Sequence, residues 1–353
     1  MYITVVAAMQ ARLPTAAIIG IIVVLGILFA ASPSIVQQKI QIKVFHAGSL
    51  IAPLQEVKES FEKKHPNVEV QLEASGSVEA VRKITELGKR AEVLAVADWL
   101  LLKNLMYPEY ADFYIKFATN NVVLAYTDKS RCADEINSQN WYEVLKRRGV
   151  RFAFSDPNRD PCGYRTVMIF VLAQLYYKEP NLFKELIEAN TNIRLESGGR
   201  HYTVLVPPEI TSKGDKVKIR PKSVELLALL EGGIVDYAFE YRSIAVQHNL
   251  RYVELPPAIH LGEPAYKDFY RQVEVKLNAG TENERTIAAS PIIYGITMPK
   301  NAQHKDLALE FIRLVLSEEG KKIFRRNGQP PLETALGYGN LPDVLAPLVE
   351  KAG

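Results

Sequence analysis

Three short turns rich in serine and glycine each follow a segment typical of a buried strand and precede a segment typical of a helix. They contain Gly48 and Ser49, then Ser77, then the loop of residues 155–162. In open α/β sheets, ligands bind beyond the carboxyl ends of the strands, where such turns gather. A helix N-terminus there offers free backbone N–H groups and a partial positive charge, which suit a small anion. Each turn taken alone is also what an ordinary helix cap requires.

Two acidic residues and a tyrosine accompany these turns. Asp160 precedes Pro161 and Cys162, Glu225 begins a later predicted helix, and Tyr241 ends an apolar segment. Each has a purely structural interpretation as well. Asp160 is a good N-cap before a proline at the first helical position, Glu225 an acid in a first turn, and Tyr241 a tyrosine at the edge of the core. Spacing alone does not separate binding from capping.

A catalytic alternative would use Cys162 as a nucleophile, with His46 or His201 as its base. A thiol at a helix N-terminus has a lowered pKa. No nucleophile motif surrounds this cysteine, however, and GxSxG, HExxH and Walker patterns are absent from the sequence. We therefore expect a binding protein that is not an enzyme and uses no cofactor. Cys132 and Cys162 either form one disulfide or stay as buried thiols, and no CxxC pair indicates zinc.

The elements that position these residues alternate between strand and helix, as in a parallel sheet with helices on its faces. No flexible linker interrupts the pattern, so we predict two α/β lobes between which the chain crosses more than once. One lobe is expected to hold residues 40–121 and 293–353, and the other residues 122–292. Strands are predicted over residues 42–46, 68–72, 92–97, 122–126, 152–155, 204–206, 236–241, 273–277 and 292–298, and helices over residues 53–64, 78–87, 141–146, 162–177, 223–230, 301–317 and 318–326, with a loop or hairpin within 190–220.

Residues 16–31 form an uncharged apolar run after Arg12. The run is shorter than the about 20 residues that span a membrane comfortably, and small residues at its end suit cleavage. Residues 1–39 are therefore expected to be a secretory signal peptide or an uncleaved N-terminal anchor, with the rest at the extracellular face of the cell membrane. The formal net charge is only +3, which gives no support to nucleic-acid binding.

Several segments resemble the archaeal-type molybdate/tungstate-binding proteins of ABC importers. The first is residues 44–50 (VFHAGSL), which is similar to the opening of these receptors. The others are residues 106–114 (MYPEYADFY), 117–121 (FATNN), 140–145 (NWYEVL) and 160–165 (DPCGYR). The resemblance implies a type II periplasmic-binding-protein fold, with a hinge and a ligand cleft between two lobes. It also implies an ABC transporter permease, and through it an ATPase, as partners of a monomeric receptor.

The resemblance further implies which residues contact the oxyanion. Serines of the first two turns would bind its oxygens, the Asp-Pro-Cys segment would add a carboxylate and backbone N–H groups, and a later glutamate a second carboxylate. The matching positions are Gly48, Ser49, Ser77, Asp160, Pro161, Cys162, Glu225 and Tyr241. Ser223 lies two residues before Glu225, so the exact position that matches the second carboxylate of the family stays open. The chain departs from the family pattern at Arg159, where a second acid is common, and at residues 95–99 (AVADW), where Ala-Ser-Ala-Asp-Tyr is common.

Two carboxylates beside a dianion need a physical reason, because like charges repel. Molybdenum(VI) and tungsten(VI) can accept further oxygen ligands, so bonds from Asp160 and Glu225 to the metal would offset the repulsion. The sulfur of sulfate and the phosphorus of phosphate cannot accept further oxygen ligands in this way, so the two carboxylates would repel these ions. The expected function is thus an extracytoplasmic receptor for molybdate or tungstate. The alternatives are a receptor for sulfate, phosphate or another small oxyanion, or an exported cysteine-dependent enzyme. The preference between molybdate and tungstate stays open, because the two ions are nearly the same size.

Overall fold

The computed structural model describes residues 39–199 and 201–352 of the chain. Residues Gln41–Gly353 form one compact unit, and the predicted export segment lies outside the described residues apart from its last position. Three sheets of seven, five and four strands make up this unit. Within the described ranges, no helix is both long enough and apolar enough to cross a membrane.

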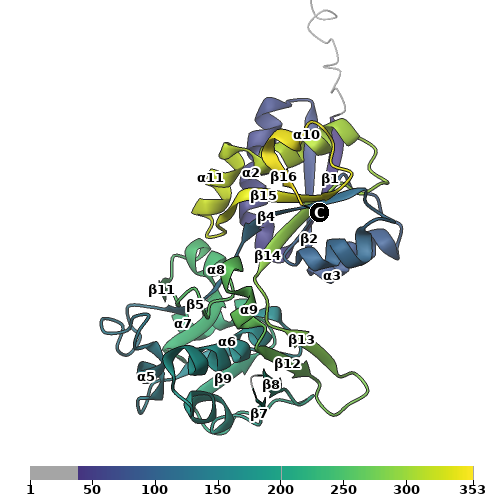
Figure 1. Ribbon diagram of the computed structural model, residues 1–353. Helices are drawn as coiled ribbons and strands as arrows, with labels where there is room; N and C mark the ends of the chain where they lie inside the picture. The colour runs from purple at the N-terminus through teal and green to yellow at the C-terminus, as the bar shows by residue number, and fades with distance from the viewer. Residues whose placement is uncertain (1–38, 200, 353) are drawn as a thin grey trace, which may run out of the picture. The chain divides into compact units, whose positions relative to one another are not determined.

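The seven-stranded sheet combines strands from both ends of the described chain (Figure 1). Strands β1 and β3 are parallel, while β14 runs antiparallel to both β3 and β4. A late segment of the chain therefore pairs with early ones. The strand order is β16-β15-β4-β14-β3-β1-β2, with β1 (Ile40–Ala47), β2 (Val68–Ser75), β3 (Val93–Val96), β4 (Phe113–Thr119), β14 (Ile293–Thr297), β15 (Pro331–Gly339) and β16 (Val349–Lys351).

Two groups of helices cover this sheet. Helices α2 (Ile51–Lys64), α10 (Lys305–Leu316) and α11 (Glu318–Arg326) pack on one another. α2 is amphipathic, and it ends at Lys64 with His65 as its C-cap, because Pro66 cannot continue a helix. Its buried Phe61 meets Phe311 of α10 edge-on, with ring centroids 5.4 Å apart. The other group is α3 (Ser77–Thr85), α4 (Trp99–Leu101) and the π-helical turn η2 (Leu102–Met106).

The remaining two sheets pack around one helix, α6 (Pro161–Tyr177), which contacts strands of both. The five-stranded sheet has the order β11-β5-β10-β6-β9, with β5 (Val122–Tyr126), β6 (Phe152–Ser155), β9 (Val217–Arg220), β10 (Tyr237–Tyr241) and β11 (Arg251–Val253). The four-stranded sheet has the order β13-β12-β8-β7, with β7 (Arg194–Gly198), β8 (His201–Leu205), β12 (Val273–Leu277) and β13 (Arg285–Ala288). Short helices α5 (Trp141–Lys146), α7 (Leu226–Glu231), α8 (Arg242–Gln247) and α9 (Lys267–Tyr270) connect these strands.

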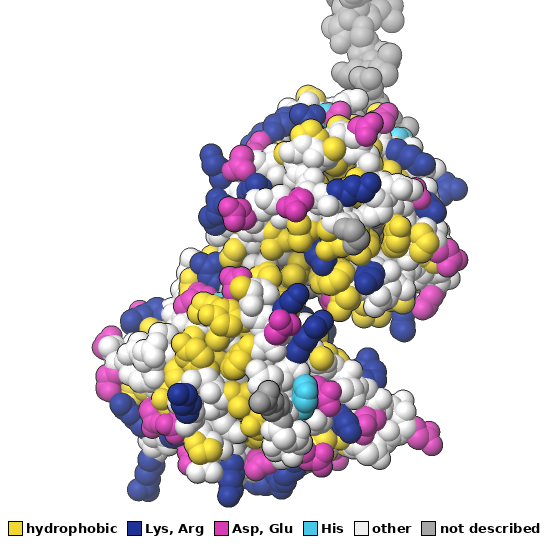
Figure 2. Space-filling model, in the orientation of Figure 1, with side chains coloured by type: hydrophobic (Ala, Val, Ile, Leu, Met, Phe, Trp, Pro, Cys, Tyr) yellow, Lys and Arg dark blue, Asp and Glu magenta, His cyan; other side chains and the backbone are white. Residues whose placement is uncertain are grey.

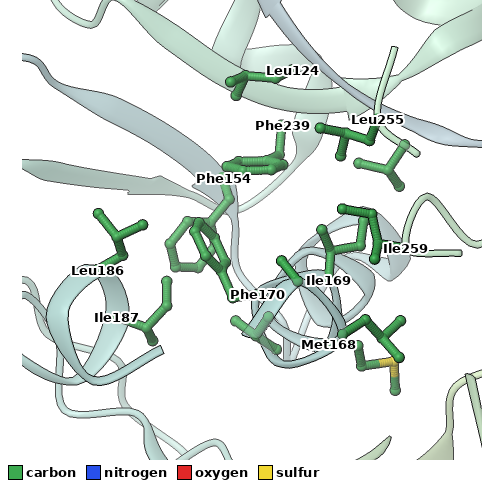
Figure 3. Close-up of a cluster of buried hydrophobic side chains, with 14 of the residues drawn as sticks. Leu124, Phe154, Met168, Ile169, Phe170, Leu186, Ile187, Phe239, Leu255 and Ile259 are labelled. Carbon is green, nitrogen blue, oxygen red and sulfur yellow. The ribbon is translucent and has the colours of Figure 1, made fainter. Parts of the chain in front are cut away.

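Helix α6 is apolar on nearly every side because it is enclosed by the two sheets. Figure 3 shows Phe170 of this helix beside Phe154 and Phe239 of the five-stranded sheet. The rings of Phe170 and Phe239 lie 5.0 Å apart, centroid to centroid. Full burial of one such side chain is worth about 1.5–3 kcal/mol. This core holds the first turn of α6, and with it Asp160, in a fixed position.

Most predicted elements are confirmed, and the differences have simple causes. The hairpin predicted within residues 190–220 is formed by β7 and β8, and the helix predicted to begin at residue 301 begins at Lys305. The sequence pattern missed β4, β9, β11, β13, β15 and β16. Most of these are short, and β15 contains glycines and a proline, which weaken the strand signal. The boundaries of the two lobes remain a prediction.

Charged side chains of both signs are interspersed on the face drawn in Figure 2. Basic and acidic groups alternate there and do not gather into one large region of a single sign, in keeping with a net charge of only +3. This face therefore lacks the basic stripe that nucleic-acid-binding proteins present.

Candidate functional site

Ser49 and Ser77 follow neighbouring strands of the seven-stranded sheet, and we call them the hydroxyl edge. Ser49 lies in a short 3-10 turn, Gly48–Leu50, directly after β1, while Ser77 opens α3 after β2. Gly48 is exposed and both serines are half-buried. Ser77 Oγ accepts a hydrogen bond from the backbone N–H of Ala97 at 3.0 Å, and Ser49 Oγ accepts one from Tyr294 Oη at 3.1 Å.

The other predicted site residues follow three adjacent strands of the five-stranded sheet, and we call them the carboxylate edge. Asp160 comes after β6, Glu225 after β9, and Tyr241 ends β10. Because β9, β6 and β10 are parallel neighbours, their carboxyl ends lie at the same edge of the sheet. Among the described residues, no hydrogen bond joins Ser49 or Ser77 to these side chains.

Asp160 caps α6 and also reaches a second segment. One carboxylate oxygen accepts from the backbone N–H of Cys162 at 2.7 Å, and the other from the backbone N–H of Ser223 at 2.9 Å. Pro161 occupies the first helical position and is exposed. The capping interpretation is therefore correct. The carboxylate is nevertheless only half-buried, and each of its oxygens has a second lone pair.

Gly163 explains why the start of α6 can lie so close to β6. A Cβ atom at this position would stand 2.1 Å from the carbonyl oxygen of Ser155. Any side chain would therefore push the helix away from the strand end and move Asp160 with it. The glycine of the Asp-Pro-Cys-Gly segment thus serves the geometry of the carboxylate edge.

The segment after β9 presents two different residues. Ser223 is buried and donates its backbone N–H to Asp160, whereas Glu225 is exposed. The Glu225 carboxylate makes no hydrogen bond or ion pair to any described residue. The structure thus brings Ser223 to Asp160, and leaves the Glu225 side chain free at the same edge of the sheet.

Tyr241 is paired with a cation that the sequence analysis did not single out. The Arg165 guanidinium, one turn into α6, donates a hydrogen bond to Tyr241 Oη. Burial raises the pKa of Tyr241 well above its ordinary value, so the phenol keeps its proton. Since its oxygen already accepts from Arg165, that proton is free to be donated elsewhere.

Glu240 is a fully buried carboxyl group behind this edge. Burial raises the pKa of Glu240 to about 8, and the negative charge of Asp160 acts in the same direction. One oxygen accepts from the backbone N–H of Tyr241 at 3.0 Å, while the other has no hydrogen-bond partner among the described residues. At neutral pH the group is therefore mainly protonated, which reduces the negative charge beside Asp160.

The cysteines do not form a disulfide, and both are free thiols. Cys132 is only partly buried, so the expectation of two buried thiols is wrong for it. Burial raises the pKa of Cys162 well above its ordinary value, and Glu240 and Asp160 act in the same direction. The lowered thiol pKa of the catalytic alternative is therefore wrong, because desolvation outweighs the helix N-terminus. Arg159 is exposed and pairs with Asp156 at 3.6 Å.

Sequence reasoning missed Arg165, Glu240 and Tyr294. For Glu240 the sequence holds a signal, since a charged residue interrupts an apolar strand. For Arg165 the signal is its place in the DPCGYR segment. Tyr294 is 245 positions from Ser49, and no local pattern could connect them. Within the described ranges, no group of three or more His, Cys, Asp or Glu side chains could hold a metal ion.

Comparisons with known proteins agree with this architecture. Residues 42–329 match the family model described as bacterial extracellular solute-binding protein. The molybdate/tungstate-binding protein WtpA of Pyrococcus abyssi is 46% identical over 349 residues, covering 97% of this chain and 99% of that protein.

Among solved structures, the substrate-binding domain of a putative molybdenum ABC transporter from Clostridium difficile aligns with a TM-score of 0.56 at 19% identity, covering 84% of this chain and 100% of that one. The sulfate-binding protein SubI of Mycobacterium tuberculosis H37Rv aligns with a TM-score of 0.51 at 13% identity, covering 87% of this chain and 90% of that one. The predicted two-lobed α/β periplasmic-binding-protein fold is confirmed by these likenesses, while the fold by itself does not select the oxyanion.

Proposed function

The chain belongs to the bacterial extracellular solute-binding protein family, and from this premise we propose that it is an extracytoplasmic receptor for molybdate or tungstate. The observation that carries the proposal is the 46% identity to a molybdate/tungstate-binding protein over 97% of the chain. The receptor passes its ligand to the permease of an ABC importer, which an ATPase drives. Residues 1–39 serve as the signal peptide or anchor that puts it outside the cytoplasm.

In this proposal the two edges share the oxyanion between them. Ser49 and Ser77, with the backbone at Gly48, donate hydrogen bonds to its oxygens, and Tyr241 donates the phenol proton that Arg165 leaves free. The N-terminus of α6 at Pro161 and Cys162 adds the positive end of a helix dipole. Hinge motion of the two lobes encloses the ion.

Asp160 and Glu225 supply the selectivity in this proposal. Their oxygens bond to the molybdenum or tungsten atom, which raises its coordination from four towards six and offsets the repulsion between the charges. The exposed Glu225 side chain, without a partner in the described structure, is available for this contact. The protonated Glu240 lessens the negative charge that the dianion meets.

Two other functions compete with this proposal. The fold is shared with a sulfate-binding protein, so a receptor for sulfate or phosphate has the same architecture. The cysteine-dependent enzyme is opposed by the burial of Cys162 and the raised pKa of its thiol. A binding role is what membership of the family indicates.

Isothermal titration of the purified chain with tungstate, molybdate, sulfate and phosphate separates these functions. Tight one-to-one binding of tungstate and molybdate, with no heat from sulfate or phosphate, is the expected result. Binding of sulfate or phosphate with similar affinity would keep the receptor and overturn the bonds to the metal. No heat with any of the four ions would overturn the oxyanion receptor itself.

A further inference from the structure

The side-chain amide of Asn120 has an orientation that its neighbours settle. Its oxygen accepts from the backbone N–H groups of Asn121 at 3.0 Å and Ser243 at 3.4 Å. Backbone N–H groups can only donate, so the amide nitrogen must point the other way. It donates to Ser243 Oγ and to Tyr294 Oη, both at 2.9 Å. Asn120 is 1% exposed, so water has little access to either bond.

Gln329 is fixed by the same logic. Its amide nitrogen donates to the backbone carbonyl of Ser49 at 2.5 Å, and a carbonyl can only accept. The same nitrogen lies 3.5 Å from Tyr294 Oη. Gln329 is completely buried. Two amide nitrogens, from Asn120 and Gln329, thus face the phenol oxygen of Tyr294.

Tyr294 therefore has one direction in which to donate its own proton. Its oxygen accepts from the two amides, and the remaining neighbour is Ser49 Oγ at 3.1 Å. A serine oxygen that accepts from Tyr294 keeps its own proton for a different acceptor. Asn120, Tyr294 and Ser49 thus form a chain of hydrogen bonds in which each residue donates to the next. The hydroxyl proton of Ser49, the last member, is then available to a ligand at the hydroxyl edge.

We propose that Tyr294, held by Asn120 and Gln329, is a positioning residue that presets the Ser49 hydroxyl as a hydrogen-bond donor to the bound oxyanion. This rests on the proposed function, in which Ser49 contacts that ion. A molybdate or tungstate dianion has only acceptor oxygens, so a preset donor matches it and loses no rotational freedom on binding. Hydrogen bonds in such a chain also polarise one another, which strengthens the last donor.

Ser77 provides an internal comparison. Its oxygen accepts from the backbone N–H of Ala97, so its proton is also free, but the donor is part of the main chain. Only at Ser49 is the direction set by side chains that substitution can remove. The proposal therefore concerns one hydroxyl of the edge and can be tested there.

The test is a double-mutant cycle of Tyr294→Phe and Ser49→Ala, with tungstate affinity measured by titration calorimetry. Tyr294→Phe keeps the ring and removes the hydroxyl, which is both the donor to Ser49 and the acceptor of the Asn120 and Gln329 amides. In the otherwise unchanged protein it is expected to weaken tungstate binding about five- to tenfold, the worth of about one hydrogen bond. In the Ser49→Ala background it is expected to change the affinity less than about twofold, because no serine remains to be oriented.

A matched control is Tyr270→Phe, which removes another buried tyrosine hydroxyl, one that donates to the carbonyl of Pro257 and makes no hydrogen bond to Asn120, Tyr294 or Ser49. It should leave the tungstate affinity unchanged even where thermal unfolding shows lower stability. The positioning role would be overturned if Tyr294→Phe lowered tungstate affinity equally in both backgrounds. It would also be overturned if Tyr294→Phe left the affinity unchanged, or if Ser49→Ala did. In each case the receptor itself would stay intact. Absence of tungstate binding by the unmodified protein would overturn the proposed function as well.

Discussion

The hydroxyl edge and the carboxylate edge are built from the same local plan, a strand followed by a helix N-terminus, but they differ in charge. At the hydroxyl edge, neutral groups behind Ser49 and Ser77 set two neutral donors. The carboxylate edge gathers Asp160, Glu225 and the cation Arg165, with the buried Glu240 behind them. Neutral donors suit any tetrahedral oxyanion, so under the proposed function we expect discrimination between oxyanions to come from the charged edge.

The largest expected effect is at Asp160. Asp160→Asn removes a charge and one acceptor oxygen. Both carboxylate oxygens of Asp160 accept hydrogen bonds from backbone N–H groups, so the new amide N–H would face one of these N–H groups. We expect tungstate affinity to fall about 100-fold, or about 2.7 kcal/mol, while sulfate binding improves relative to tungstate. Competition titration measures both quantities. Asp156→Asn, a change in the same loop at a residue that pairs with Arg159, is the control and should preserve the ratio. An unchanged tungstate-to-sulfate ratio in Asp160→Asn would refute the bonds to the metal.

The second effect is on stability and concerns Glu240. Burial raises the pKa of this carboxyl from 4.5 to about 8, so over that interval the folded chain keeps a proton that the unfolded chain loses. The contribution of Glu240 to the free energy of unfolding is therefore fully present below about pH 4.5, and it is lost as the pH rises to about 8. Glu240→Gln cannot ionise, so its free energy of unfolding should fall less over this range than that of the unmodified protein. Denaturant unfolding at a series of pH values measures the difference, and parallel curves would show that Glu240 does not titrate in this range.

A smaller and different effect is expected at the hydroxyl edge. Ser77→Ala removes one neutral donor and should weaken tungstate, molybdate and any bound sulfate alike, by about five- to tenfold. The ratio between the ions should stay constant, in contrast to Asp160→Asn. Ser60→Ala, which removes a serine hydroxyl that donates to Glu319, controls for the loss of a hydroxyl in general. A changed ratio between the ions in Ser77→Ala would mean that the hydroxyl edge also contributes to selectivity, against the division proposed between the two edges.

The smallest effect is expected from blocking the thiols. Cys162 is completely buried and Cys132 only partly so, so iodoacetamide should alkylate Cys132 alone in the folded protein. Tungstate affinity should then change less than about twofold. Mass spectrometry of the peptides gives the site of labelling, and Cys132→Ser serves as the unlabelled control. Labelling of Cys162 with loss of binding would reopen a functional role for this thiol.

The sequence determined the turns, the caps and the alternation of strands and helices, because these depend on residues close together in the chain. Asp160 before a proline, a buried strand before Gly48, and glycine at position 163 are local signals of this kind. They were sufficient to predict the fold class and the edges of the sheets at which the candidate residues lie. The resemblance of these segments to a known family then indicated the oxyanion.

Only the tertiary structure decided how the candidate groups are oriented and charged. Tyr294 reaches Ser49 across 245 positions of sequence, Arg165 meets Tyr241 across 76, and Asp160 meets Ser223 across 63. The burial that raises the pKa of Glu240 and of Cys162 likewise arises from strands and helices distant in the chain. Hydrogen-bond direction and desolvation depend on everything that surrounds a group in space, and a linear pattern records only its neighbours along the chain.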